Sequence, residues 1–234
     1  MTTPQPPLAA AIEPVREVTL SLLADLDVWK ALLAQEGLRP AVTDGKARLI
    51  ITASDSVFKG VPFRELAISV HVEPPREGLA PEGHFLVHAY NSSRFFAFIE
   101  RAVFHTPYYH AQVSVNPKLP ASIRVSRDGN DCFRATMGES RSPRSDAAER
   151  MHGPIYLPRG SAVEGGKLFY ATLEGQTQTY DFNPAQDAVV VSPSAPEAVF
   201  RALRDSHVQG EEWIIRERGR HAKSRTVRWS GAAR

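Results

Sequence analysis

Short apolar stretches separated by turn residues run through most of the chain. Within 64–72, Leu66, Ile68 and Val70 alternate with polar or small residues, and one of the polar residues is Glu65. A period of two is typical of a strand with one face toward a core, so this strand places a carboxylate on its other face. Further strands are predicted at 15–23, 47–53, 84–90, 111–115, 122–126, 132–137, 167–173, 176–182, 188–191, 212–216 and 226–229. Asp128-Gly129 and Glu174-Gly175 are typical hairpin turns.

Helical spacing indicates three helices, at 28–35, 94–104 and 195–203. The second begins after Ser92 or Ser93 and ends before Pro107, which cannot continue a helix. Its aromatic and aliphatic residues, Phe95 and Phe98 among them, recur at helical spacing. We expect this stripe to pack in the core rather than to hold a ligand.

Many short strands with three helices between them predict an α+β fold. We expect a large antiparallel sheet that curls into a barrel, since sheets of this size tend to close. The proposed division is a disordered N-terminal segment at 1–11, one domain at 12–230 and a frayed tail at 231–234. The polar stretch 140–150 is expected to be a mobile excursion.

Composition fits a globular chain, with 42% apolar and 23% charged residues in 234. One cysteine, Cys132, excludes an internal disulfide and favours a reducing cytoplasm. No apolar run approaches the roughly 20 residues of a membrane helix, and the N-terminus does not read as a secretory signal, so no membrane association is expected.

The charge is uneven along the chain. The whole sequence carries +2, but 216–234 holds seven Lys or Arg and one Glu. Such a segment is either a phosphate-binding arm or a solvated terminal strand. We favour the strand, because Trp229 is its only aromatic residue for base stacking, and we do not expect nucleic acid as a partner.

Common catalytic and cofactor motifs are absent, including phosphate-binding glycine loops, the nucleophile elbow and His-Glu-x-x-His. His84 and His88 would lie about 13 Å apart on one strand, too far to share an ion. His105 and His110 flank Pro107 without an acidic or cysteine partner nearby in the sequence. We therefore expect neither a metal nor a cofactor.

Two histidines and two tyrosines gather where the second helix gives way to a strand: His105, Tyr108, Tyr109 and His110. In a barrel mouth these side chains can donate hydrogen bonds or transfer protons. They can equally form a structural plug whose polar tips satisfy the local backbone. The residues themselves do not decide between the two.

The order of these elements resembles the acetoacetate decarboxylase-like superfamily. The resemblance rests on Arg16-Glu17 before a strand, on Pro62-Phe-Arg-Glu65 opening another, and on the corner Pro107-Tyr-Tyr-His-Ala111 after a helix. It extends over about 15–140, and the Pro-Tyr-Tyr-x-Ala form is similar to a bacterial branch of the superfamily. It implies a cone-shaped antiparallel barrel with an internal pocket.

The resemblance also implies site residues. Arg16 stands where the decarboxylases hold the substrate carboxylate, and Glu65 where they keep an active-site glutamate. Tyr108 and Tyr109 stand in place of two lysines, the first of which forms a Schiff base in the true decarboxylases. A phenol cannot form an imine, so that reaction is not expected. Lys118, in Asn116-Pro-Lys-Leu-Pro120, is an alternative nucleophile in a shifted alignment.

Three functions follow from this comparison. The first is binding of a small carboxylate- or carbonyl-bearing molecule inside the barrel, with Arg16 as clamp and His105 and His110 as further contacts. If the chain is an enzyme, it performs lyase- or hydrolase-type acid–base chemistry with Glu65 as base and Tyr108 or Tyr109 as acid. The alternatives are a Lys118-dependent decarboxylase of a β-keto acid and a non-catalytic ligand-sensing module. A homo-oligomer is compatible with all three.

Overall fold

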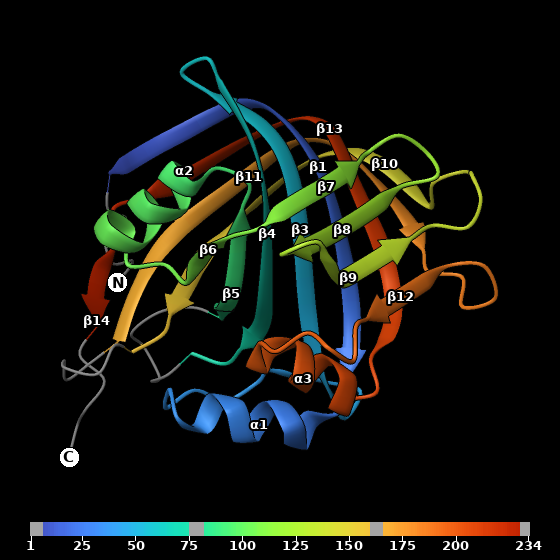
Figure 1. Ribbon diagram of the computed structural model, residues 1–234, viewed down its shortest axis with the longest axis horizontal. Helices are drawn as coiled ribbons and strands as arrows, with labels where there is room; N and C mark the ends of the chain where they lie inside the picture. The colour runs from blue at the N-terminus through green and yellow to red at the C-terminus, as the bar shows by residue number, and fades with distance from the viewer. Residues whose placement is uncertain (1–6, 75–81, 160–165, 230–234) are drawn as a thin grey trace.

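A ten-stranded sheet curls into a ring and forms most of the molecule (Figure 1). The computed structural model describes residues 7–74, 82–159 and 166–229. The strands follow the order β1-β13-β11-β10-β5-β4-β3-β2, and β1 also pairs with β3, which closes the ring. Its strands are β1 (Leu8–Ala24), β2 (Val42–Thr43), β3 (Lys46–Phe58), β4 (Val61–Val72), β5 (Gly83–Asn91), β6 (Tyr108–His110), β10 (Ser145–Leu157), β11 (Gly166–Asp181), β13 (Gln209–Ser224) and β14 (Val227–Trp229).

The α+β class and the curled sheet predicted from the sequence are confirmed, but the sheet is mixed. Most neighbouring strands are antiparallel, whereas β5 runs parallel to both β10 and β6. The parallel contact with β10 extends over only two residue pairs, Ile155 with His84 and Tyr156 with Phe85. This short contact joins the two halves of the sheet.

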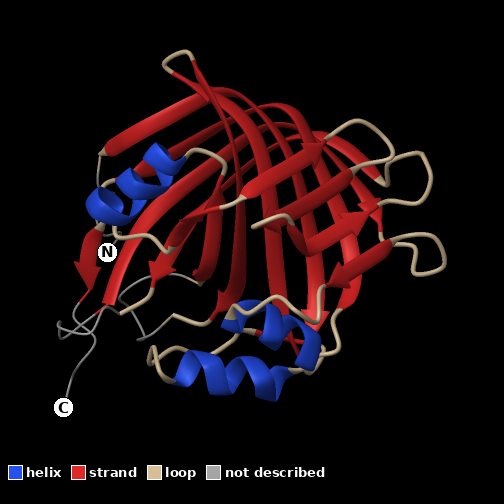
Figure 2. Ribbon diagram, in the orientation of Figure 1, coloured by secondary structure: helices blue, strands red, loops and turns tan. Residues whose placement is uncertain are grey.

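A smaller sheet and three α-helices complete the fold (Figure 2). The smaller sheet has the order β12-β9-β8-β7 and contacts the large sheet through β7. Its strands are β7 (Gln112–Asn116), β8 (Ser122–Arg127), β9 (Asn130–Thr136) and β12 (Ala188–Val191). The helical segments are α1 (Leu26–Ala34), α2 (Arg94–Ile99), the π-helix η1 (Glu100–Phe104) and α3 (Ala198–Asp205).

The main core lies between one face of the ring and the smaller sheet with α3. Alternate residues of the ring strands supply it, for example Val18, Leu66 and Tyr90 in one row across the strands. Tyr90 stacks on Phe200 of α3 with ring centroids 6.0 Å apart. Because side chains alternate along a strand, the opposite face of the ring is free to carry polar groups.

Several strands are longer than the sequence indicates. β1 begins at Leu8, which pairs with Ser224, so 8–11 belong to a strand rather than to a disordered segment. Residues 1–6 and the expected tail at 231–234 lie outside the described residues. The stretch expected to be a mobile excursion contains the first half of β10, paired with β11 throughout.

The hairpin predicted at Glu174-Gly175 is wrong, because β11 continues through it to Asp181. Gly175 has a φ of +149°, a conformation that side chains rarely adopt. A Cβ added there would lie 3.0 Å from the carbonyl oxygen of Arg218. The glycine therefore allows close approach of β13 instead of forming a turn.

The helix predicted at 94–104 is divided, and its aromatic stripe is not in the core. Ser93 caps α2 by accepting a hydrogen bond from the backbone N–H of Phe96 at 3.3 Å. The helix then changes to the π-helical η1, which alters the direction of the side chains that follow. Phe95 is 65% exposed and Phe98 58%, so the prediction that this stripe packs internally is wrong.

The basic C-terminal segment forms a strand, as expected, but it is not simply a solvated one. Arg216 is completely buried, and His221 and Lys223 are largely covered. Across the described ranges, the fold includes no helix with the length and hydropathy needed to span a membrane.

Candidate functional site

A row of polar side chains crosses the ring on the face opposite the main core. Glu17 on β1 pairs with Ser54 on β3, Ser54 with Glu65 on β4, and Glu65 with Asn91 on β5. On its other side Glu17 pairs with Arg216 of β13. Paired residues of neighbouring strands share a face, so the ring brings two carboxylates and a guanidinium into one row.

Glu17 is the centre of a buried ion cluster. Its Oε1 lies 2.5 Å from Nη1 of Arg216, and its Oε2 lies 2.5 Å from Nε2 of His221. Burial by itself would raise the pKa of this carboxyl, but the neighbouring His221 and Arg216 hold the pKa below its ordinary value. Glu17 is therefore a buried carboxylate that stays ionised because it is paired.

An extra residue in β13 brings its basic side chains to one face. The step of five residues in β13 from Ile215 to Arg220 lies opposite a step of four in β11, from Gln178 to Glu174. Without this irregularity, residues five apart such as Arg216 and His221 would point to opposite faces. With it, both bond to Glu17.

Glu65 and Tyr108 form the second part of the site, and each side chain shifts the pKa of the other. Burial and the negative charge of Glu100 raise the pKa of Glu65. Burial, Glu65 and Glu100 raise the pKa of the Tyr108 phenol well above its ordinary value. Tyr108 is thus a neutral donor at any physiological pH, and Glu65 is a carboxyl that holds its proton more readily than usual.

Lys223 supplies an amine beside these groups. Its Nζ donates a hydrogen bond to Glu100 of η1, and it lies 3.8 Å from the centroid of the Phe104 ring. Thr106 donates a further hydrogen bond to the same carboxylate at 2.9 Å. The charge of Lys223 lowers the pKa of Glu65, which places the amine near that carboxyl.

The two clusters adjoin. The charge of His221 acts on both Glu17 and Glu65 and lowers the pKa of each. Glu65 and Tyr108 are each partly covered rather than completely buried. Arg216 is fully buried, and its Nη2 has no hydrogen-bond partner among the described residues.

Of the residues expected in the site, the structure brings Glu65 and Tyr108 together but not Arg16. Arg16 neighbours Glu17 in β1 and therefore points to the other side of the strand. Its side chain is 57% exposed and forms an ion pair with Asp55 at 2.5 Å. The guanidinium that reaches the polar row is that of Arg216.

Lys118 also lies away from Glu65. It is exposed in the turn between β7 and β8, and its backbone N–H donates to the side chain of Asn116 at 3.2 Å. That turn belongs to the smaller sheet rather than to the ring.

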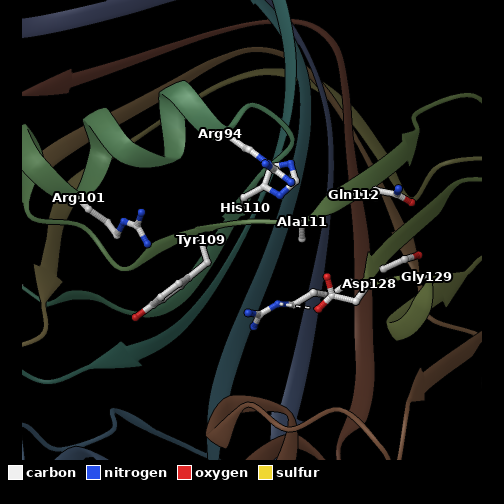
Figure 3. Close-up of a pocket in the computed structure, with 10 residues that line it drawn as sticks. Arg94, Arg101, Tyr109, His110, Ala111, Gln112, Asp128 and Gly129 are labelled. Atoms are coloured by element: carbon white, nitrogen blue, oxygen red, sulfur yellow. Dashed lines mark ion pairs between the residues drawn. The ribbon is translucent and has the colours of Figure 1, made fainter.

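Tyr109, His110 and His105 lie outside the Glu65 cluster. Tyr109 follows Tyr108 in β6 and points away from it into a surface pocket of about 420 Å³, which His110 also lines (Figure 3). His105 is exposed at the end of η1 and has a φ of +58°. Strand alternation in β6 is the reason that the two tyrosines are separated.

Several solved structures share the fold of this chain. The chain matches an acetoacetate decarboxylase-like enzyme from Sphingomonas wittichii RW1 with a TM-score of 0.61 and 16% identity, covering 95% of this chain and 93% of that one. It matches the acetoacetate decarboxylase of Legionella pneumophila with a TM-score of 0.66 and 13% identity, covering 98% and 92%. This chain has the acetoacetate decarboxylase-like fold.

A third match with this fold is the enduracididine biosynthesis enzyme MppR, in complex with the condensation product of pyruvate and imidazole 4-carboxaldehyde. The TM-score is 0.65 and the identity 13%, and the match covers 99% of this chain and 92% of that one. No protein-family model and no curated protein matches the sequence.

Sequence reasoning missed the basic half of the site in this acetoacetate decarboxylase-like fold. Arg216, His221 and Lys223 come from a strand about 150 residues beyond Glu65, and the sequence signalled them only as a basic segment. Which of its residues turn inward depends on the irregularity in β13, which no local pattern marks.

Chemically, the site combines a neutral phenol, a carboxyl with raised pKa, an ion-paired amine and a buried guanidinium. Together these groups can take up and return a proton and stabilise a developing negative charge. Among the described residues, no three His, Cys, Asp or Glu side chains converge as metal ligands would.

Proposed function

We propose that the chain binds a small organic acid with a carbonyl group inside the ring and performs acid–base chemistry on the carbon next to that carbonyl. The pair of Glu65 and Tyr108 carries this proposal, since the two side chains act on each other and burial raises the pKa of both. A base whose pKa is raised toward the operating pH is suited to proton abstraction. The complex of MppR with pyruvate offers a precedent in the same fold.

The proposed reaction is an enolisation. The Glu65 carboxylate takes a proton from the α-carbon, and the C–H electron pair moves into the enolate. Tyr108 donates a hydrogen bond to the enolate oxygen, and the ammonium of Lys223 offsets its charge. Protonation of the same carbon by Glu65 completes the cycle.

Arg216 is the proposed clamp for the substrate carboxylate. Its Nη1 is occupied by Glu17, but its Nη2 has no partner among the described residues. A buried donor without a partner is costly, and a carboxylate is the group that a guanidinium binds best. Arg216 thereby replaces Arg16 in this role.

We propose that no imine forms. The Nζ of Lys223 is engaged by the Glu100 carboxylate and lies against the Phe104 ring, so it is not free to approach a carbonyl. The position of Lys223 near Glu65 nevertheless favours a Schiff base on Lys223 as a second candidate function.

Proton exchange of pyruvate in D₂O tests the proposal. We expect the wild-type chain to accelerate loss of the methyl NMR signal. Glu65→Gln should remove this activity, and Tyr108→Phe should reduce it. The acid–base pair as a whole is expected to account for about 10²–10⁴-fold of the exchange rate. Glu73→Gln is the matched control and should leave exchange unchanged, because Glu73 lies just beyond β4, is partly exposed and pairs with Arg39.

Two further results decide between the functions. Borohydride reduction with pyruvate should give no adduct; an adduct on Lys223 would establish the imine route, and one on Lys118 would restore the decarboxylase alternative. Pyruvate binding without exchange would indicate a ligand-sensing module. Failure of pyruvate and of larger 2-oxo and 3-oxo acids to bind would contradict the proposal altogether.

A further inference from the structure

A basic pocket lies on the outer side of the segment that carries the candidate site. It has a volume of about 420 Å³ and is bounded by α2, η1 and β6 on one side and by the β8–β9 turn on the other (Figure 3). Arg101 and Tyr109 line it, whereas the residues just before them, Glu100 and Tyr108, lie beside Glu65. The two sites are therefore separate and lie back to back.

The pocket carries more positive charge than its own carboxylates offset. Arg127 is matched by Glu197 at 2.8 Å and by Asp128 at 3.7 Å. Arg94 and Arg101 also line the pocket, and neither forms an ion pair within the part of the chain that the structure describes. Two guanidinium groups from different turns thus line one cavity without an ion pair of their own among the described residues.

The pocket wall is ordered by ring contacts. Tyr109 stacks on His88 with ring centroids 4.8 Å apart and an angle of 8° between the planes. The guanidinium carbon of Arg101 lies 5.4 Å from the centroid of the same tyrosine ring. Arg101 is thereby held beside a flat aromatic surface, which lowers the entropy that a ligand must remove.

We propose that this pocket binds a small organic anion with at least two negative charges, either carboxylates or phosphates. Guanidinium groups present paired donors that match the planar carboxylate and the phosphate group. Arg94 and Arg101 contribute from α2 and η1, so a ligand that spans both needs two charged groups rather than one. The volume is sufficient for a molecule of about citrate size.

Isothermal titration calorimetry at low ionic strength tests this binding with two probes, citrate for the carboxylates and inorganic pyrophosphate for the phosphates. We expect one saturable site for at least one probe, weakened by added salt. The better probe identifies the ligand class. Arg101→Ala and Arg94→Ala should each lower affinity about tenfold or more, because each removes a charged hydrogen bond.

The matched control is Arg201→Ala, an exposed arginine of α3 outside the pocket, which should leave affinity unchanged. All three arginines are exposed, and equal thermal melting curves will show that the variants fold. Saturation by neither probe at millimolar concentration would overturn the proposal. An equal loss of affinity in Arg201→Ala would also overturn it, since binding would then follow overall charge.

Discussion

Glu17 and Arg216 are 199 residues apart in the chain, yet they face each other across β1 and β13 with Nη1 2.5 Å from Oε1. Both side chains are almost completely buried. Removing one member of such a pair leaves a buried charge without compensation. The pair therefore joins the two ends of the chain and makes each charge depend on the other.

We expect Arg216→Met to lower the free energy of unfolding by about 3–5 kcal/mol, because Glu17 is then buried with one fewer cation. Urea unfolding followed by circular dichroism measures the loss. Arg16→Ala is the neighbouring control and should cost less than about 1 kcal/mol, since the Arg16–Asp55 pair is exposed. Equal losses in the two variants would contradict the importance assigned to burial.

A side chain at Gly175 should destabilise the fold. Its φ of +149° opposes alanine, and so does the carbonyl oxygen of Arg218, which would lie 3.0 Å from the added methyl group. The same methyl would lie 3.2 Å from Cδ of Arg216. We expect Gly175→Ala to cost about 1–3 kcal/mol in urea unfolding. Gly153→Ala, on β10 with open space around the added Cβ, should change stability much less.

Asp187 should make the fold sensitive to acid. Its buried carboxylate accepts hydrogen bonds from Arg141, from Nε1 of Trp213 at 2.9 Å and from two backbone N–H groups. Although burial opposes ionisation, these donors lower the pKa of Asp187 to about 2. A carboxyl with a lowered pKa stabilises the fold above its ordinary value of 3.8 and loses that effect as the pH falls toward 2.

Asp187→Asn should therefore be less stable than the wild-type chain, and the difference should be largest at neutral pH, about 3–5 kcal/mol. The difference should shrink between pH 4 and about 2 as the wild-type carboxyl takes up its proton. Thermal unfolding across this range is the measurement. Asp181→Asn, whose side chain is 69% exposed, is the control and should differ little from the wild-type chain in stability. A pH-independent deficit in Asp187→Asn would show that packing, not charge, is responsible.

Glu65 should have the opposite effect on stability. A raised pKa means that the folded chain holds this proton more tightly than the unfolded chain does, so the ionised carboxyl weakens the fold above that pKa. Glu65→Gln should melt a few degrees higher than the wild-type chain at pH 7–8. The advantage should disappear as the pH is lowered below the ordinary value of 4.5. A lower melting temperature at neutral pH would mean that the carboxylate is stabilised in place.

Local pattern determined much of the fold. Alternation in β4 predicted both a strand and the polar face on which Glu65 lies, because the period of two follows from backbone geometry alone. The corner at Pro107 predicted where the helix ends, but the short strand β6 that follows it was not predicted. The aromatic stripe of α2 misled, because spacing shows only that residues share a face and not whether another element covers that face.

Tertiary structure decided the composition of the site. Arg16 and Glu17 are adjacent, and only the register of β1 with β3 and β13 fixes which of them turns toward Glu65. The extra residue in β13 likewise decides that Arg216 and His221 share a face. A one-residue difference in register exchanges the two faces of a strand, and register is set by pairing between segments that are distant in the chain. The sequence by itself indicated Glu65 and Tyr108, and the closed ring determined that Glu17 and the basic residues of β13 join them.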